Sequence, residues 1–249
     1  MERRMKYRNC IFNLYGTLVD IHTDEERPQL WRDMAAYFAA ERVHYGPDAL
    51  HIRFKAICRS LDRESPLRKG AKEPHPEIRM EEVFLSLYAE KGVLAGAGQA
   101  ERAARYFREK STDYIRLYPG AKELLSRLRS EGRGVYLLAN AQRAFAMWEL
   151  EHLGLADAFD GMLISSDCGV RKPDKRFFDM LLRRCGIAAG SAVMIGSDGR
   201  CDVAGAKKAG LSSVYIRSNL SPNEPQPDAD YALDHMDLAR VGDILLQNE

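Results

Sequence analysis

The feature that most constrains the fold is a regular alternation of strand and helix patterns in the second half of the chain. Short apolar runs typical of buried strands lie at 135–139, 162–165, 192–195 and 214–216. Helical patterns lie at 121–131, 144–153, 175–185 and 203–209. This alternation is typical of a parallel sheet covered by helices on both faces. The chain is therefore predicted to be α/β, with a doubly wound parallel sheet.

A long helical stretch interrupts this pattern near the start of the chain. Residues 21–114 show mainly helical periodicity, and Thr23 and Glu26 have the spacing of a capping box at a first helix. Two further helices are expected at 77–90 and 99–114. The most economical layout is an α/β core, formed by 1–20 and 115–249, with an inserted all-helical domain at 21–114.

Composition narrows the class of protein. The formal charge of the 249 residues is +1, so no bulk basicity suggests nucleic acid as a partner. The five cysteines are scattered and lack paired metal-ligand spacing, which favours free thiols in a reducing compartment. Neither an apolar leader nor a long apolar run occurs, so a membrane span is not expected. A cytoplasmic protein is the default expectation, and the sequence gives no indication of oligomeric state.

Polar residues follow four of the expected strands, where an open parallel sheet collects functional groups. They are Asn13, Tyr15 and Thr17 after a further short apolar run at 10–12, Asn140 after Ala139, Lys172 in the loop that follows 162–165, and Asp198 and Asp202 after 192–195. Each has a purely structural explanation when taken alone. Asn140 could cap a helix, Lys172 could be a solvated surface residue, and the aspartates could stabilise a helix start.

Taken together, these segments resemble the motifs of the haloacid dehalogenase-like (HAD) superfamily. Ile11–Asp20 is similar to the family's nucleophile turn, D-x-D-G-T, or D-x-Y-G-T in dehalogenases. Ala139-Asn140 resembles the second motif, a strand that ends in Ser or Thr, often followed by Asn. Lys172-Pro173 resembles the third motif, and the two aspartates resemble the acidic fourth motif. The helical insertion also falls where members of the family carry a cap.

The resemblance implies a role for each of these residues. Position 13 would be the nucleophile, Tyr15 would take the place of the acid/base residue, and Lys172 would offset negative charge. Binding of a small anionic substrate would involve Thr17, Ala139, Asn140 and Lys172. Hard oxygen ligands for Mg²⁺ would come from Asn13, the carbonyl of Tyr15, Asp198 and Asp202.

Three departures from the family pattern affect activity. Asn13 is neutral, so it is a poor nucleophile, and it lowers the negative charge available to Mg²⁺, whose binding is expected to be weakened or absent. A Tyr15 phenol with an ordinary pKa of about 10 transfers protons poorly near neutrality. Ala139 lacks the hydroxyl that would bind the transferring group.

Three functions follow as hypotheses. The first is a Mg²⁺-dependent, phosphatase-type hydrolase whose turnover is impaired by Asn13. The second is a relative of 2-haloacid dehalogenases, since Tyr15 matches that branch and a departing halide needs no proton. The third is a pseudoenzyme that keeps the cleft as a binding protein. In the basic stretch of the insertion, Arg53 or Arg59 is a further candidate to face an anionic substrate.

Overall fold

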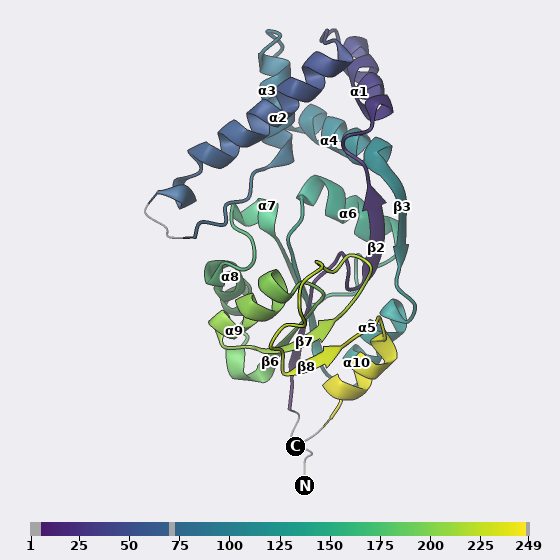
Figure 1. The fold of residues 1–249 in the computed structure, drawn as a ribbon, viewed down its shortest axis with the longest axis vertical. Coiled ribbons are helices and arrows are strands. Elements are labelled where there is room, and N and C mark those ends of the chain that lie inside the picture. Colours follow the sequence, from purple (N-terminus) through teal and green to yellow (C-terminus); the bar gives the residue numbers. More distant parts are fainter. Residues whose placement is uncertain (1–5, 70–72, 248–249) are drawn as a thin grey trace.

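The fold is built around one parallel sheet (Figure 1). The structure, a computed structural model, describes residues 6–69 and 73–247. Six strands pair in parallel in the order β5-β4-β1-β6-β7-β8. They are β1 (Asn9–Phe12), β4 (Gly134–Ala139), β5 (Gly161–Ile164), β6 (Ala192–Gly196), β7 (Ser212–Ile216) and β8 (Tyr231–Leu233). The predicted α/β class is confirmed.

Helices cover both faces of this sheet, as the hydrophobic runs of the strands require. Cys10 and Phe12 of β1 belong to an apolar cluster shared with helices of one face, whereas Ile11 belongs to the cluster of the other face. This division follows from the two-residue period of a strand. The first face carries α5 (Ala121–Ser130), α6 (Arg143–His152) and α10 (Leu238–Leu245), and the second carries α8 (Lys175–Cys185) and α9 (Gly205–Ala209).

A two-stranded antiparallel ribbon leads from the sheet to a separate group of helices, seen at the top of Figure 1. The ribbon consists of β2 (Val19–Thr23) and β3 (Thr112–Leu117). Between its strands lie α1 (Pro28–Ala40), α2 (Pro47–Glu64), α3 (Met80–Ala89) and α4 (Ala97–Ser111), here called the helical segment. These helices bury an apolar cluster of their own, which also takes in Phe145 of α6. In the described part of the chain, no helix is long and apolar enough to span a bilayer.

Two local predictions about the insertion are wrong. Thr23 ends β2 and caps no helix, because α1 begins only at Pro28 and its N-cap residue, Arg27, makes no side-chain capping bond. The helix expected to reach residue 114 stops at Ser111, and the chain continues as β3. The residues of β3 include Thr, Tyr and Ile, which suit a strand once a partner is available. That partner, β2, lies about ninety residues earlier in the chain.

Candidate active site

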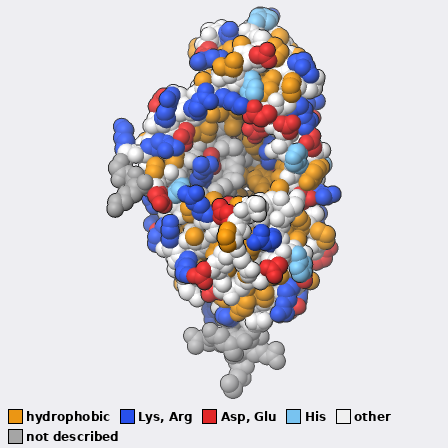
Figure 2. Space-filling model, in the orientation of Figure 1, with side chains coloured by type: hydrophobic (Ala, Val, Ile, Leu, Met, Phe, Trp, Pro, Cys, Tyr) orange, Lys and Arg blue, Asp and Glu red, His pale blue; other side chains and the backbone are white. Residues whose placement is uncertain are grey.

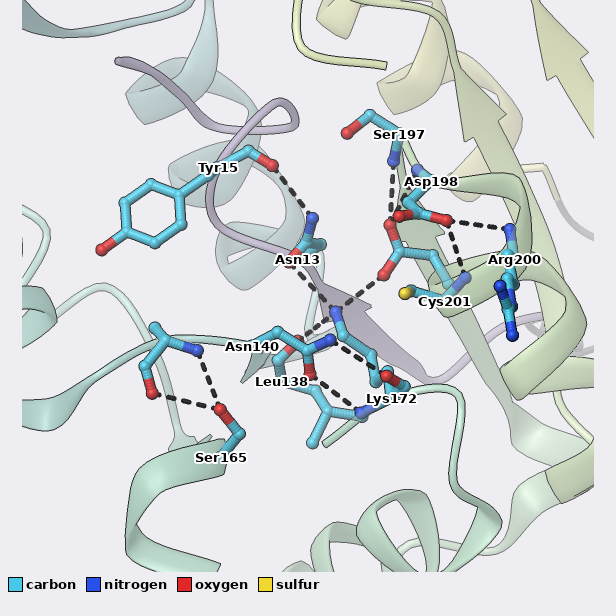
Figure 3. Close-up of polar contacts among 12 residues, drawn as sticks. Asn13, Tyr15, Leu138, Asn140, Ser165, Lys172, Ser197, Asp198, Arg200 and Cys201 are labelled. Carbon is cyan, nitrogen blue, oxygen red and sulfur yellow. Dashed lines mark hydrogen bonds and ion pairs between the residues drawn. The ribbon is translucent and has the colours of Figure 1, made fainter. Parts of the chain in front are cut away.

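The predicted site residues meet at the carboxyl edge of the sheet. β1 lies between β4 and β6, so the residues that follow these three strands are neighbours in space. Asn13 follows β1, Asn140 follows β4, and Ser197 and Asp198 follow β6. The strand order reverses at β1, and such a switch point opens a crevice for ligands. Figure 3 shows the resulting group of side chains.

Lys172 is the centre of this group. Its side chain is almost fully buried, and its ammonium donates to Oδ1 of Asn13 at 3.0 Å, Oδ1 of Asp202 at 2.7 Å and the carbonyl of Leu138 at 2.7 Å. All three ammonium hydrogens are therefore used. Asn140 fixes the backbone of Lys172, since its Oδ1 accepts from the Lys172 N–H at 2.8 Å and its Nδ2 donates to the carbonyl at 3.1 Å. Asn140 thus holds the lysine loop and does not cap α6, which begins after Gln142.

The two aspartates differ in their surroundings. Asp202 is 1% exposed, and its Oδ2 accepts from the backbone N–H groups of Ser197 and Asp198, each at 3.0 Å. Burial raises the pKa of this carboxyl, while Lys172 and the backbone amide act in the opposite direction. Asp198 caps the following π-helical turn through Oδ1, which accepts two backbone N–H bonds. Asp202 therefore accepts three hydrogen bonds from protein donors, whereas Oδ2 of Asp198 makes no hydrogen bond with the described residues.

Asn13 satisfies both ends of its amide within the site. Lys172 donates to Oδ1, which leaves Nδ2 to donate to the carbonyl of Tyr15 at 3.0 Å. A hydrogen on Nδ2 of Asn13 thus points at the Tyr15 carbonyl oxygen, which is one of the ligands predicted for Mg²⁺. Within residues 6–69 and 73–247, no cluster of three His, Cys, Asp or Glu side chains could hold a metal ion. Since Asp202 also accepts three hydrogen bonds from the protein, the oxygen ligands that this sequence offers fit Mg²⁺ poorly.

Tyr15 turns its hydroxyl away from Asn13 (Figure 3). The phenol donates to Oε2 of Glu149 on α6, and the Glu149 side chain is 1% exposed. The other carboxylate oxygen of Glu149 accepts from Nε of Arg108 on α4 at 2.6 Å. Burial, followed by the nearby Glu149 carboxylate, raises the pKa of Tyr15 well above its usual value. The phenol proton is therefore bound tightly and directed at Glu149 instead of the reaction centre.

The remaining predicted residues line or support the same turn. Thr17 is fully buried, and its hydroxyl makes no hydrogen bond with any residue that the structure describes. Ala139 is buried in the apolar cluster beneath the site. Gly16 has φ +80°, and a Cβ there would lie 2.4 Å from Oγ of Ser197. Only glycine suits this turn, because its backbone passes close to the end of β6.

A cleft of about 490 Å³ lies between the helical segment and the edge of the sheet. Figure 2 shows the molecule hollowed there, with Lys and Arg side chains along one rim. Charged side chains that line the cleft are Glu25, Glu77, Arg108 and Arg171. The hypothesis that Arg53 or Arg59 faces the substrate is wrong. Arg53 forms an exposed ion pair with Glu90, and neither arginine lines the cleft.

Several residues in or behind the cleft could not be found from the sequence. Glu149 and Arg108 belong to no motif, and Glu77 stands out in the sequence only as the start of an expected helix. Glu77 accepts from Ser165 Oγ at 2.8 Å and from Gln142 Nε2 at 3.2 Å, so it links the segment before α3 to the sheet edge. The one available signal was a charged residue, Arg108, on the apolar side of the α4 pattern.

Comparison with known proteins settles the family. A sequence model described as haloacid dehalogenase-like hydrolase matches residues 7–210. The chain belongs to this family. Among curated HAD relatives, the phosphoserine phosphatase of Thermus thermophilus is 35% identical over 223 residues, which cover 80% of this chain and 84% of the relative.

Solved HAD structures share the fold over nearly the whole chain. The 2-haloacid dehalogenase of Pseudomonas syringae pv. Tomato DC3000 has a TM-score of 0.63 at 23% identity, covering 96% of this chain and 98% of the other. The putative HAD-hydrolase YfnB of Bacillus subtilis, described as bound to magnesium, has a TM-score of 0.55 at 23% identity, covering 96% and 99%. Both phosphatases and dehalogenases are therefore similar to this HAD chain.

Proposed function

We propose that this HAD chain binds a small phosphate monoester in its cleft, with the phosphoryl group beside Asn13, and that Asn13 prevents efficient hydrolysis. The observation that carries the proposal is the buried Lys172 ammonium, which contacts the side-chain oxygen at position 13. A lysine in this place offsets the charge of a phosphoryl oxygen. The Thr17 hydroxyl, which has no hydrogen-bond partner among the described residues, supplies a further donor. The phosphatase among the relatives supports the choice of ester.

In this proposal the residues divide into binding and supporting roles. Lys172, whose ammonium hydrogens are all taken by protein acceptors, offsets the charge of the transferring group. Thr17 is the donor assigned to that group, and Asn140 acts through the Lys172 backbone that it holds. Residues 21–114 act as a cap over the site, so the α/β core consists of 1–20 and 115–249. The five free cysteines agree with a cytoplasmic setting. A carboxylate at position 13, Asp198 and the Tyr15 carbonyl would hold Mg²⁺, which would supply neutralisation of phosphoryl charge.

The test restores the nucleophile. An Asn13→Asp chain assayed with p-nitrophenyl phosphate and Mg²⁺ is expected to exceed the unaltered chain by roughly 10⁴-fold or more, the scale of losing a nucleophile in hydrolases. Asn9→Asp, the same change at the other end of β1, is the matched control and stays inactive. Tyr15 directs its proton at Glu149, so it is not placed to protonate a leaving group. An aryl oxide can leave without a proton, whereas an alkyl oxide needs one, so the Asn13→Asp chain should strongly prefer aryl over alkyl phosphates.

A dehalogenase is the second candidate, and the orientation of Tyr15 favours it, because halide departure needs no proton. Halide release from 2-chloropropionate by the Asn13→Asp chain without Mg²⁺, with no ester hydrolysis, would replace the first proposal. If Asn13→Asp hydrolyses neither compound, yet the unaltered chain binds a phosphate ester, the cleft serves binding alone. If the unaltered chain binds no phosphate ester and the Asn13→Asp chain turns none over, the proposal is refuted.

A further inference from the structure

The cleft contains an arginine that is held on one edge and free on the other. Nε of Arg108 donates to Glu149 at 2.6 Å, while the two terminal nitrogens of the guanidinium make no hydrogen bond with the described residues. The side chain is only 10% exposed and lines the cleft. Its unbonded edge is therefore the part available to a ligand.

The orientation of this guanidinium is fixed by its neighbours. Its central carbon lies 5.5 Å from the ring centre of Tyr15 and 5.2 Å from that of Phe145, both of which line the same cleft. Contacts of a guanidinium with aromatic rings are favourable and restrict its motion. Glu149 is held in turn by the Tyr15 phenol. Arg108 is therefore preorganised before any ligand arrives, which lowers the entropy lost on binding.

We propose that Arg108 binds a carboxylate on the leaving group of the substrate, so that the substrate class is phosphate monoesters that carry a carboxylate. The inference rests on the proposed function, because it assumes that the phosphoryl group lies beside Asn13. Two parallel N–H donors of a guanidinium match the two oxygens of a carboxylate. Glu149 already balances most of the charge of Arg108, and Glu25 lines the same cleft. A monoanion therefore suits this position better than a second, doubly charged phosphate.

Two commercially available ligands isolate the carboxylate. O-phosphoserine and O-phosphoethanolamine share the phosphate and the ammonium group, so any effect of Glu25 on the ammonium is common to both. The unaltered chain, which turns over poorly, permits equilibrium titration calorimetry with each ligand. Phosphoserine is expected to bind at least about tenfold more tightly, since a charge-assisted hydrogen bond contributes a factor of this order or more.

Variants then assign the preference to Arg108. Arg108→Met should reduce the preference to near unity while leaving the affinity for phosphoethanolamine within about threefold. Arg108→Lys keeps the charge beside Glu149 but loses the two parallel N–H donors of the guanidinium, so it should lose most of the preference for phosphoserine. Arg105→Met, an exposed cation one turn earlier on α4, is the matched control and should keep it. Thermal melting identifies the variants that remain folded.

The outcomes separate this inference from the function on which it rests. Equal affinities of the unaltered chain for the two ligands would overturn the role of Arg108 but leave phosphate-ester binding intact. Binding of neither ligand would overturn the role of Arg108, and it would overturn the proposed function as well if the Asn13→Asp chain also fails to hydrolyse p-nitrophenyl phosphate. A folded Arg108→Met or Arg108→Lys chain that keeps the preference, or an Arg105→Met chain that loses it, would also contradict the proposal. If Arg108→Met fails to fold, the lysine variant and the two ligands still decide.

Discussion

Removal of the Lys172 ammonium tests the electrostatic core of the site. Lys172→Met keeps a similar length but removes the partner of Asp202, whose side chain is 1% exposed. Breaking a buried ion pair by removing one member costs about 3–5 kcal/mol, because the other charge is left in a medium that solvates it poorly. Two backbone amides still bind Oδ2 of Asp202, so the lower half of this range is expected. A loss near 3 kcal/mol is a large part of the stability of a typical domain.

The unfolding free energy lost in Lys172→Met should become smaller as the pH falls. Burial already raises the pKa of Asp202, and without Lys172 the pKa rises further. A carboxyl whose folded-state pKa is raised binds a proton more readily in the folded chain, so its destabilising effect fades as the pH falls through that pKa. The difference in unfolding free energy between the unaltered chain and Lys172→Met should therefore shrink between pH 7 and pH 5.

Urea unfolding followed by circular dichroism measures these differences. With ordinary urea m-values, a loss of this size moves the midpoint by roughly 1–2 M. Lys175→Met is the matched control, since Lys175 forms an exposed pair with Asp179 and should change stability by less than about 1 kcal/mol. Adding Asp202→Asn to Lys172→Met should recover part of the loss, because no charge is then buried. A loss under about 1 kcal/mol, or one that grows on acidification, would refute the reasoning.

Three further predictions concern the residues around this core. Tyr15→Phe should cost about 1–3 kcal/mol in thermal or urea unfolding, because Glu149 loses a donor, yet leave hydrolysis by Asn13→Asp within a few-fold. A drop in that hydrolysis beyond about a hundredfold would show that the phenol takes part in proton transfer. Asn140→Ala should cost about 1–2 kcal/mol and lower phosphate-ester affinity by misplacing Lys172; unchanged affinity would contradict that role. Mg²⁺ should raise the melting temperature of Asn13→Asp but not of the unaltered chain, as calorimetry can check.

Much of the core could be predicted because its signals are local. Helix α8 spans 175–185 as expected, since Asp174 accepts from the N–H of Arg176 at the start and Gly186 adopts a left-handed conformation at the end. The β2–β3 ribbon could not be found this way. Its strands pair across the whole helical segment, and the local pattern at Thr23 is equally compatible with a helix start. Pairing with β3 makes Thr23 the end of a strand and not the start of a helix.

The site shows the same division. Asn13, Asn140 and Lys172 could be placed together because strand ends of a parallel sheet meet at one edge, and the motif order assigns each to its strand. The pairing of Arg108 with Glu149 depends on the rotation of α4 against α6, which no spacing within either helix reveals. Likewise, the sequence places Tyr15 in the site, but the direction of its hydroxyl is set by Glu149, 134 residues later in the chain.

The Asn13 amide is matched electrostatically to its two protein neighbours. Its Oδ1 accepts from Lys172 and its Nδ2 donates to the Tyr15 carbonyl, so each polar group has a partner of opposite polarity. An aspartate in the same orientation would place a carboxylate oxygen 3.0 Å from that carbonyl oxygen, where Nδ2 now stands. Two acceptors at this distance repel unless a cation or proton lies between them. In the proposed function, an amide at position 13 therefore lacks both the nucleophile and the electrostatic need for Mg²⁺, and both properties should appear together in Asn13→Asp.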